Sequence, residues 1–228
     1  MPENSYSAFA LFLDLPFLGL LLLIVFALIL SSYVKIATVL SFVRAGFGFT
    51  GMPSVFITGG LALVLSLFIM MPTLTQSISK VDEAVGDKKL ASDVARVRGL
   101  ALAAESWKEF IFKNTTNEAR LVFVALAEKL DKRSNRQSNQ ASIAELENSW
   151  RILAPTFILS ELKKAFATGL YLFLPFLLID LLVAAVLMSL NIVQLNPYLT
   201  SLPLKVLVFV ALDGWNLVSF NLLNTYLS

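Results

Sequence analysis

The sequence predicts an all-α protein of the integral membrane type, built from helical hairpins with four apolar segments and a helical polar insert between the second and third. The 228 residues are 57% hydrophobic with a mean hydropathy of +0.76, typical of a membrane protein or of one that buries apolar surface in an assembly. Of the 18 basic and 16 acidic residues, 27 fall within Lys80–Lys164. The chain therefore divides into an N-terminal hairpin (1–79), a charged extracytoplasmic insert (80–154) and a C-terminal hairpin (155–228).

The composition excludes several classes of function. The chain has no cysteine and no histidine, which excludes disulfides, thiol nucleophiles, Cys/His metal sites and histidine-based catalysis. We expect no catalytic residues, no cofactor and no metal. The net charge of +2 is too small to favour nucleic-acid binding.

The first hairpin consists of two apolar segments. Leu15–Val34 is charge-free and long enough to span a bilayer. No basic residue precedes Lys35, so the segment lacks the start of a signal peptide and is expected to be uncleaved. The second segment, Val55–Met71, is expected to end at Pro72. Because the loop between them carries Lys35 and Arg44, the positive-inside rule places it in the cytoplasm and the insert on the far side.

The loop also contains GFGFTG, Gly46–Gly51, which matches the dinucleotide-binding pattern GxGxxG. That motif requires a strand before it and a long helix directly after it. Here an apolar helix precedes it and Met52-Pro53 follows, so the glycines are interpreted as a flexible loop.

The insert is predicted to form three helices. The second and third are expected to follow Thr115 and Ser142, because Glu118 and Glu145 complete capping-box patterns. The polar stretch Asp131–Ser142 would link them. Apolar residues at helical spacing give the first helix one face (Leu90, Val94, Val97, Ala101, Ala104, Trp107 and Ile111) and the third another (Ile143, Leu146, Trp150 and Leu153).

The third apolar segment follows a polar helical start at Pro155. It is charge-free from Ala165 to Ile179, and its apolar sequence continues after Asp180 to Ile192. Gly169 and Pro175 are expected to interrupt the helix. A turn-rich connection, Val193–Pro203, then leads to the fourth segment, which opens at Lys205 and is expected to break at Gly214.

Each of the last two segments contains one acid in apolar surroundings, Asp180 and Asp213. An acid at a bilayer centre costs roughly 2.5–3.5 kcal/mol. We therefore expect each acid to be buried with a partner, in a cavity or at a subunit contact, and not to face lipid.

Several strings resemble one known family. SELKKAF (Ser160–Phe166), LPFLLIDL (Leu174–Leu181) and LPLKVLVFVALDGW (Leu202–Trp215) are similar to signatures of the FliP/SctR family of type III secretion export-gate proteins. SYVKIATVLSFVRAGFG (Ser32–Gly48) and LALVLSLFIMMP (Leu61–Pro72) are similar to that family's first hairpin. Flagellar members commonly carry a signal peptide, so its absence favours the injectisome branch.

This resemblance implies a function that spacing alone does not. Several copies, expected to be five, assemble with two smaller membrane subunits into a pore-forming entry portal through which unfolded substrate proteins are exported. The family resides in the bacterial inner membrane, and its assembled complex extends towards the periplasm.

The resemblance also selects candidate residues. In the family, a loop after the third segment often carries consecutive methionines that form a gasket in the pore. Ile192, Val193 and Gln194 occupy this place here, without a methionine. The candidates for subunit contacts are Glu161, Lys163, Lys164, Asp180, Lys205, Asp213 and Trp215.

Two other functions remain open on the residues alone. Asp180 and Asp213 could bind a cation in a small-solute or ion-coupled transporter whose halves act as repeats. They could also serve an intramembrane protease, although their contexts, LLIDLL and VALDGW, share no catalytic motif.

Overall fold

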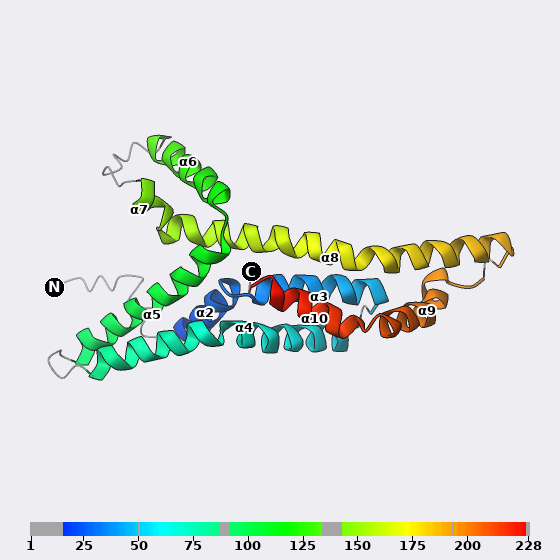
Figure 1. Cartoon of the computed structure of the whole chain (residues 1–228), viewed down its shortest axis with the longest axis horizontal. Helices are drawn as coiled ribbons and strands as arrows, with labels where there is room; N and C mark the ends of the chain where they lie inside the picture. The colour runs from blue at the N-terminus through cyan, green and yellow to red at the C-terminus, as the bar shows by residue number, and fades with distance from the viewer. Residues whose placement is uncertain (1–15, 50, 87–91, 134–142, 193, 227–228) are drawn as a thin grey trace, which may run out of the picture.

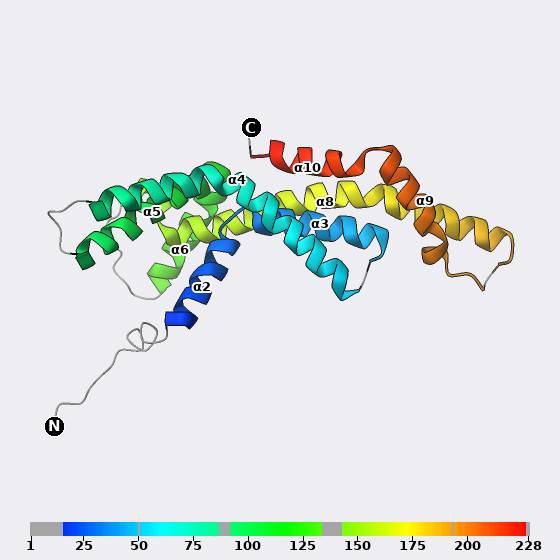
Figure 2. The same cartoon turned by 90° about the horizontal axis from the view of Figure 1, so that it is seen from below.

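A computed structural model describes residues 16–49, 51–86, 92–133, 143–192 and 194–226. Throughout these ranges the regular structure is α-helical, which confirms the predicted fold class. The helices form an elongated bundle, with the insert helices at one end and the α8–α9 hairpin tip at the other (Figure 1). A 90° turn shows that α2 (Pro16–Ile29) projects away from the bundle (Figure 2).

Helix α3 (Tyr33–Phe47) is the centre of the bundle and packs against both α4 and α8. Its apolar face recurs every three or four residues and is fully enclosed: Ile36, Val39, Leu40, Val43 and Phe47. The predicted loop therefore does not start at Lys35, because Lys35 lies on this buried helical face, whereas its cytoplasmic location stays a prediction. The helix ends at Gly48, whose φ of 83° suits glycine and whose N–H donates to the carbonyls of Arg44 and Ala45.

The predicted single span Leu15–Val34 is also broken, because the chain leaves helical geometry between Ile29 and Tyr33. Side chains satisfy the polar groups at this break. The Trp107 indole N–H donates to the Leu30 carbonyl at 2.8 Å, and the Ser32 and Ser66 hydroxyls lie 3.0 Å apart. Buried polar groups need such partners, so the break is fixed by contacts that are distant in sequence.

Helix α4 (Met52–Gly86) continues through Pro72, where the sequence predicted its end. The Thr75 hydroxyl donates to the Met71 and Pro72 carbonyls, at 3.0 and 2.9 Å. In apolar surroundings a continuing helix satisfies more backbone groups than an interrupted one, so a proline is tolerated. The second half of α4 packs along α5 (Ser92–Asn114).

The second predicted insert helix is α6 (Asn117–Arg133), which follows Thr115 as expected. Thr115 does not form the predicted capping box, since its hydroxyl donates to the Phe112 carbonyl and accepts from Arg120. Buried Arg120 also donates to the Phe112 and Thr115 carbonyls and so caps the end of α5. Most of the predicted linker, and Ser142, lie outside the described residues.

The third predicted insert helix is divided in two. Helix α7 (Ile143–Glu147) ends before Trp150, and Trp150 and Leu153 belong to α8 (Trp150–Ser189). Helix α8 runs without a break for 40 residues. The predicted domain boundaries at 79/80 and 154/155 therefore fall inside α4 and α8, and the division into domains stays a prediction.

The predicted interruptions of α8 at Gly169 and Pro175 are wrong. A Cβ at Gly169 would lie 2.2 Å from the Phe42 ring of α3, so glycine there permits a close helix approach. The Phe42 ring itself packs edge-on against Phe166 and Phe173. Aromatic packing across the α3–α8 contact thus supports a long continuous helix.

The connection to the last segment is shorter than predicted, because α9 (Pro197–Ala211) begins six residues earlier than Pro203. Asn196 caps it by accepting the Tyr198 N–H at 3.0 Å, and Pro197 occupies the first turn. Helix α10 (Gly214–Asn224) follows a 61° bend at Leu212–Asp213. The predicted break at Gly214 is thus confirmed to within two residues.

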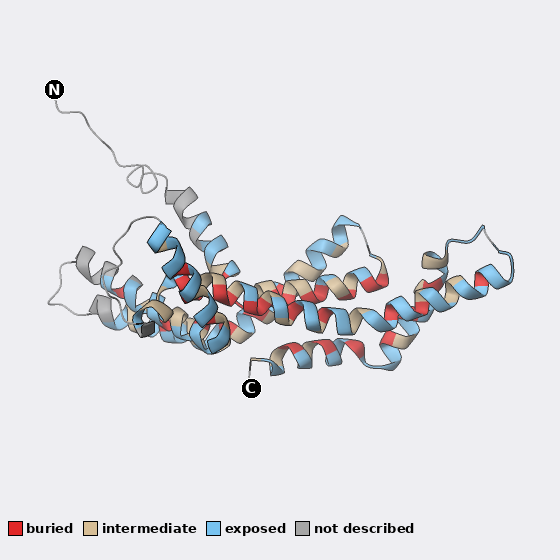
Figure 3. Cartoon of the chain, turned by 90° about the horizontal axis from the view of Figure 1, so that it is seen from above, coloured by how far each residue is buried: buried red, intermediate tan, exposed pale blue. Residues whose placement is uncertain are grey.

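Helices α4 and α8 are long and apolar enough to cross a membrane, and α9 with α10 adds a third span if the bent pair counts as one. Only 17% of the most apolar window of α4, and of α8, is buried within the chain. Buried residues follow the seams between helices while the outer faces are exposed (Figure 3). Lipid or other protein must therefore cover these helices.

Candidate functional site

Asp180 finds its partner inside the chain. The Lys205 ammonium lies 2.7 Å from an Asp180 carboxylate oxygen and donates to the Gly46 carbonyl, also at 2.7 Å. The Ser201 hydroxyl donates to the other oxygen of Asp180, and the Tyr198 ring lies 4.7 Å from the ammonium. Lys205 is fully buried, and the Asp180 side chain is 25% exposed. This Asp180 cluster (Asp180, Ser201, Lys205 and Gly46) joins α8, α9 and α3.

A second buried group, the Glu161 cluster, joins α3 and α8 to the residues after α10. Glu161 is fully enclosed and lies 3.8 Å from the Lys35 ammonium and 3.2 Å from that of Lys164. The Tyr226 hydroxyl donates to Glu161, and the Tyr226 ring lies 4.2 Å from the Lys35 ammonium. Lys164 also donates to the Asn114 carbonyl at the end of α5.

Burial shapes the protonation of this cluster. Desolvation lowers the pKa of Lys35 to about 8, although the nearby Glu161 carboxylate opposes the shift. Lys35 lies on α3, which is not one of the candidate spans. Desolvation, together with Glu161, raises the pKa of the Tyr226 phenol. The Lys35 ammonium has no hydrogen-bond acceptor among the described residues, so only the carboxylate and the aromatic ring balance its charge.

Asp213 differs from its expected role. It is exposed, adopts a left-handed conformation at the start of α10 with φ of 48°, and accepts a hydrogen bond from Asn216 at 3.2 Å. It is therefore not buried within the chain. Between Ser201, the partner of Asp180, and Asp213, twelve residues of mostly helical chain rise about 18 Å. The two acids do not converge, so neither the paired-cation site nor the aspartyl protease gains support.

The remaining contact candidates are less enclosed. Lys163 is exposed on α8, and Trp215 is 54% exposed with its edge against the Phe209 ring, 5.4 Å between centroids. Their roles in subunit contacts stay predictions.

The pore-loop candidates lie at the hairpin tip, between the end of α8 and the start of α9 (Figure 1). Ile192 is 38% exposed and Gln194 is exposed, whereas Val193 lies outside the described residues. Met188 and Leu190, which the sequence did not single out, are exposed by 76% and 61% beside them. The tip thus presents apolar side chains that the chain itself leaves uncovered.

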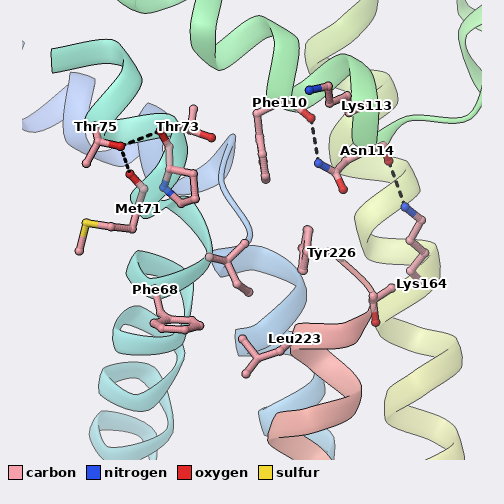
Figure 4. A pocket seen from close by; sticks show the side chains of 13 residues that line it. Phe68, Met71, Thr73, Thr75, Phe110, Lys113, Asn114, Lys164, Leu223 and Tyr226 are labelled. Atoms are coloured by element: carbon pink, nitrogen blue, oxygen red, sulfur yellow. Dashed lines mark hydrogen bonds between the residues drawn. The ribbon is translucent and has the colours of Figure 1, made fainter. Parts of the chain in front are cut away.

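A large cavity of about 1110 Å³ opens between α4, α5, α8 and the residues after α10. Figure 4 shows Phe68 and Met71 of α4 on one side and Phe110 of α5 with Tyr226 on the other. Lys164 also lines this cavity, so two members of the Glu161 cluster contact it. The chain alone does not fill the space beside its central ion pair.

Sequence reasoning found Glu161, Lys164, Asp180 and Lys205 but not Lys35 and Tyr226. The sequence pattern could have predicted that Lys35 is buried, because it lies next to Ile36 and Val39 at helical spacing. The hydropathy pattern placed the end of that helix too early. No sequence pattern predicted the role of Tyr226, because its contact with Glu161 spans 65 residues of sequence.

The fold and these clusters define a class of protein: an all-α membrane protein whose apolar hairpins are joined by buried ion pairs. A profile of the FliP family matches residues 17–222, and the chain belongs to this family. It is therefore a component of the type III secretion export apparatus and an inner-membrane protein.

Relatives from several bacteria support this family assignment. The flagellar biosynthetic protein FliP of Bacillus subtilis (strain 168) is 36% identical, covering 99% of this chain and 95% of that protein. The hypersensitivity response secretion protein HrcR of Ralstonia nicotianae is 32% identical, covering 88% of this chain and 89% of that protein. The surface presentation of antigens protein SpaP of Shigella flexneri is 30% identical, covering 87% of this chain and 88% of that protein. Flagellar and non-flagellar relatives both match, so the preference for the injectisome branch stays a prediction.

Proposed function

We propose that the chain is a pore-forming core subunit of the export apparatus. Several copies, expected to be five, would assemble with two smaller membrane subunits into a portal for unfolded secreted proteins, extending towards the periplasm. The observation that carries this proposal is the uncovered apolar tip, at Leu190, Ile192 and Leu195, at the far end of the bundle from the insert helices (Figure 1).

Symmetry explains why such a tip fits a pore. Copies arranged around an axis repeat the same side chains at the lumen, and a ring of apolar side chains can block water and ions by dewetting. Ile192 is β-branched and its side chain is stiffer than that of methionine. Closure of the pore would therefore depend more on where the loops lie than on side chains that adapt their shape. The uncovered faces of α4 and α8 would supply subunit contacts.

Ile192, Val193 and Gln194 can be replaced together by glycine to test the seal. The complex, purified with its membrane partners, should still assemble by native mass spectrometry, but its ion conductance in a planar bilayer should rise. Gln194→Gly alone is the matched control and should leak least, since its amide can hold water. A closed parent complex with an equally closed triple variant would place the seal elsewhere. A monomer or dimer that binds cations would favour a transporter instead.

A further inference from the structure

An apolar groove with one cation at its edge is lined by none of the residues of the two ion-pair clusters. It encloses about 290 Å³ between α3, the start of α4, α9 and α10. Phe47, Ile57, Phe209 and Trp215 form much of its wall. Several walls are open to the surroundings, with Ile57 68% and Trp215 54% exposed. The volume is at the lower end for ligand pockets, which suits part of one hydrocarbon chain.

The cation is Arg44, which is half-buried and lines the groove. Across the described residues, its guanidinium has no acidic partner and no carbonyl acceptor. The groove wall itself contains no acid. By contrast, buried Lys35 and Lys205 each have a carboxylate within 4 Å. An unpaired guanidinium beside apolar surface favours an anion, and its five donors suit a phosphate.

We propose that this Arg44 groove binds one anionic phospholipid, with the phosphate on the Arg44 guanidinium and an acyl chain along Phe47, Phe209 and Trp215. The candidate spans α4 and α9–α10 line the groove, so lipid tails reach it directly. The hydroxyls of Ser54 and Thr58 are also in the wall, beside the headgroup position. Basic pockets between membrane helices on the cytoplasmic side recognise anionic headgroups, and the positive-inside rule predicts that side for Arg44.

A second copy of the chain is the competing occupant. It would have to bring an acid to Arg44, yet the buried Glu161 and partly buried Asp180 already have lysine partners. Asp213 is exposed, but its carboxylate already accepts a hydrogen bond from Asn216 of its own chain. The described exposed acids lie mainly on the insert helices, at the other end of the bundle (Figure 1). Charge complementarity therefore favours the lipid, and this inference is independent of the portal proposal.

Trp215 is a built-in reporter of this groove. Replacing Trp107 and Trp150 with phenylalanine leaves Trp215 as the only indole, and circular dichroism checks that the full-length chain stays helical. Phospholipids with brominated acyl chains quench a tryptophan that they contact. We expect brominated phosphatidylglycerol to quench Trp215 at about fivefold lower mole fraction than brominated phosphatidylcholine, the effect of roughly one basic residue near an anionic surface.

The variants identify the headgroup contact. Arg44→Gln should abolish the preference for phosphatidylglycerol, Arg44→Lys should keep most of it, and Arg98→Gln, an exposed arginine on α5, should leave it unchanged. Equal quenching by both lipids, or an unchanged preference in Arg44→Gln, overturns the proposal. Loss of the preference on adding millimolar inorganic phosphate would indicate a free-phosphate site. No quenching by either lipid in a self-associated chain would indicate that a second copy covers the groove.

Discussion

Asp180→Asn is expected to destabilise the fold far more than Asp213→Asn, although both acids lie in apolar sequence. Asp180 is the only charged partner that the described structure gives the buried Lys205 ammonium, at 2.7 Å. Asp213 is exposed and accepts a single hydrogen bond from Asn216. The two substitutions are chemically identical, so Asp213→Asn is the matched control.

The magnitude follows from burial. Removing one member of a fully buried ion pair costs roughly 3–5 kcal/mol, because the other charge stays buried without its partner. The Asp180 side chain is 25% exposed, so water screens part of the pair and the lower end, about 3 kcal/mol, applies. An exposed change such as Asp213→Asn typically stays within about 0.5 kcal/mol.

Thermal unfolding of the full chain in detergent measures both variants. For a chain of this length about 2–4 °C is lost per kcal/mol, so Asp180→Asn should lower the midpoint by roughly 6–12 °C. Adding Lys205→Met to Asp180→Asn should recover part of the loss, because the unpaired charge disappears. Equal midpoints for the two aspartate variants, or a double variant no more stable than Asp180→Asn, would show that the Lys205–Asp180 pair does not stabilise the fold.

Two further predictions concern packing and pH. Gly169→Ala should destabilise the fold by about 1–3 kcal/mol, because the added Cβ would lie 2.2 Å from the Phe42 ring. Gly60→Ala is the matched control and should stabilise the fold by roughly 0.5–1 kcal/mol, because its Cβ would meet nothing within 4 Å. The thermal midpoints of the two variants should shift in opposite directions, and a shift in the same direction would contradict this prediction. Lys35 has a pKa of about 8 when folded, against 10.5 for an unperturbed lysine, so the unfolded state binds more protons between these values and stability should rise with pH there. Lys35→Met should flatten that rise in detergent, and an unchanged slope would show that other groups cause it.

The sequence predicted helix type well but misplaced several ends, for a common physical reason. Hydropathy treated Lys35 and Pro72 as the ends of segments, yet α3 and α4 continue through them. A charged residue can stay within a packed helix when it has a buried partner, as Lys35 has in Glu161. A proline can stay within a helix when ending the helix there would leave backbone groups without hydrogen bonds. Both conditions depend on tertiary contacts, which local sequence does not contain.

The candidate site was predictable where the chemistry was local. Asp180 in an apolar run required a partner, and Lys205 fulfils that requirement within the same hairpin. Asp213 looked equivalent, but the bend before α10 turns it outward. The contact from Lys205 to the Gly46 carbonyl spans 159 residues, and no pattern in a single sequence encodes it.

The Glu161 cluster has a consequence for biogenesis. Lys35 emerges from the ribosome about 125 residues before Glu161, a delay of roughly 6–25 s at ~5–20 residues per second. Tyr226, whose ring faces the Lys35 ammonium, follows Glu161 by a further 65 residues. During that interval the first hairpin carries a cation without its counter-charge, which opposes deep insertion. The nascent hairpin is therefore expected to wait at the membrane surface, or with an insertion factor, until α8 arrives.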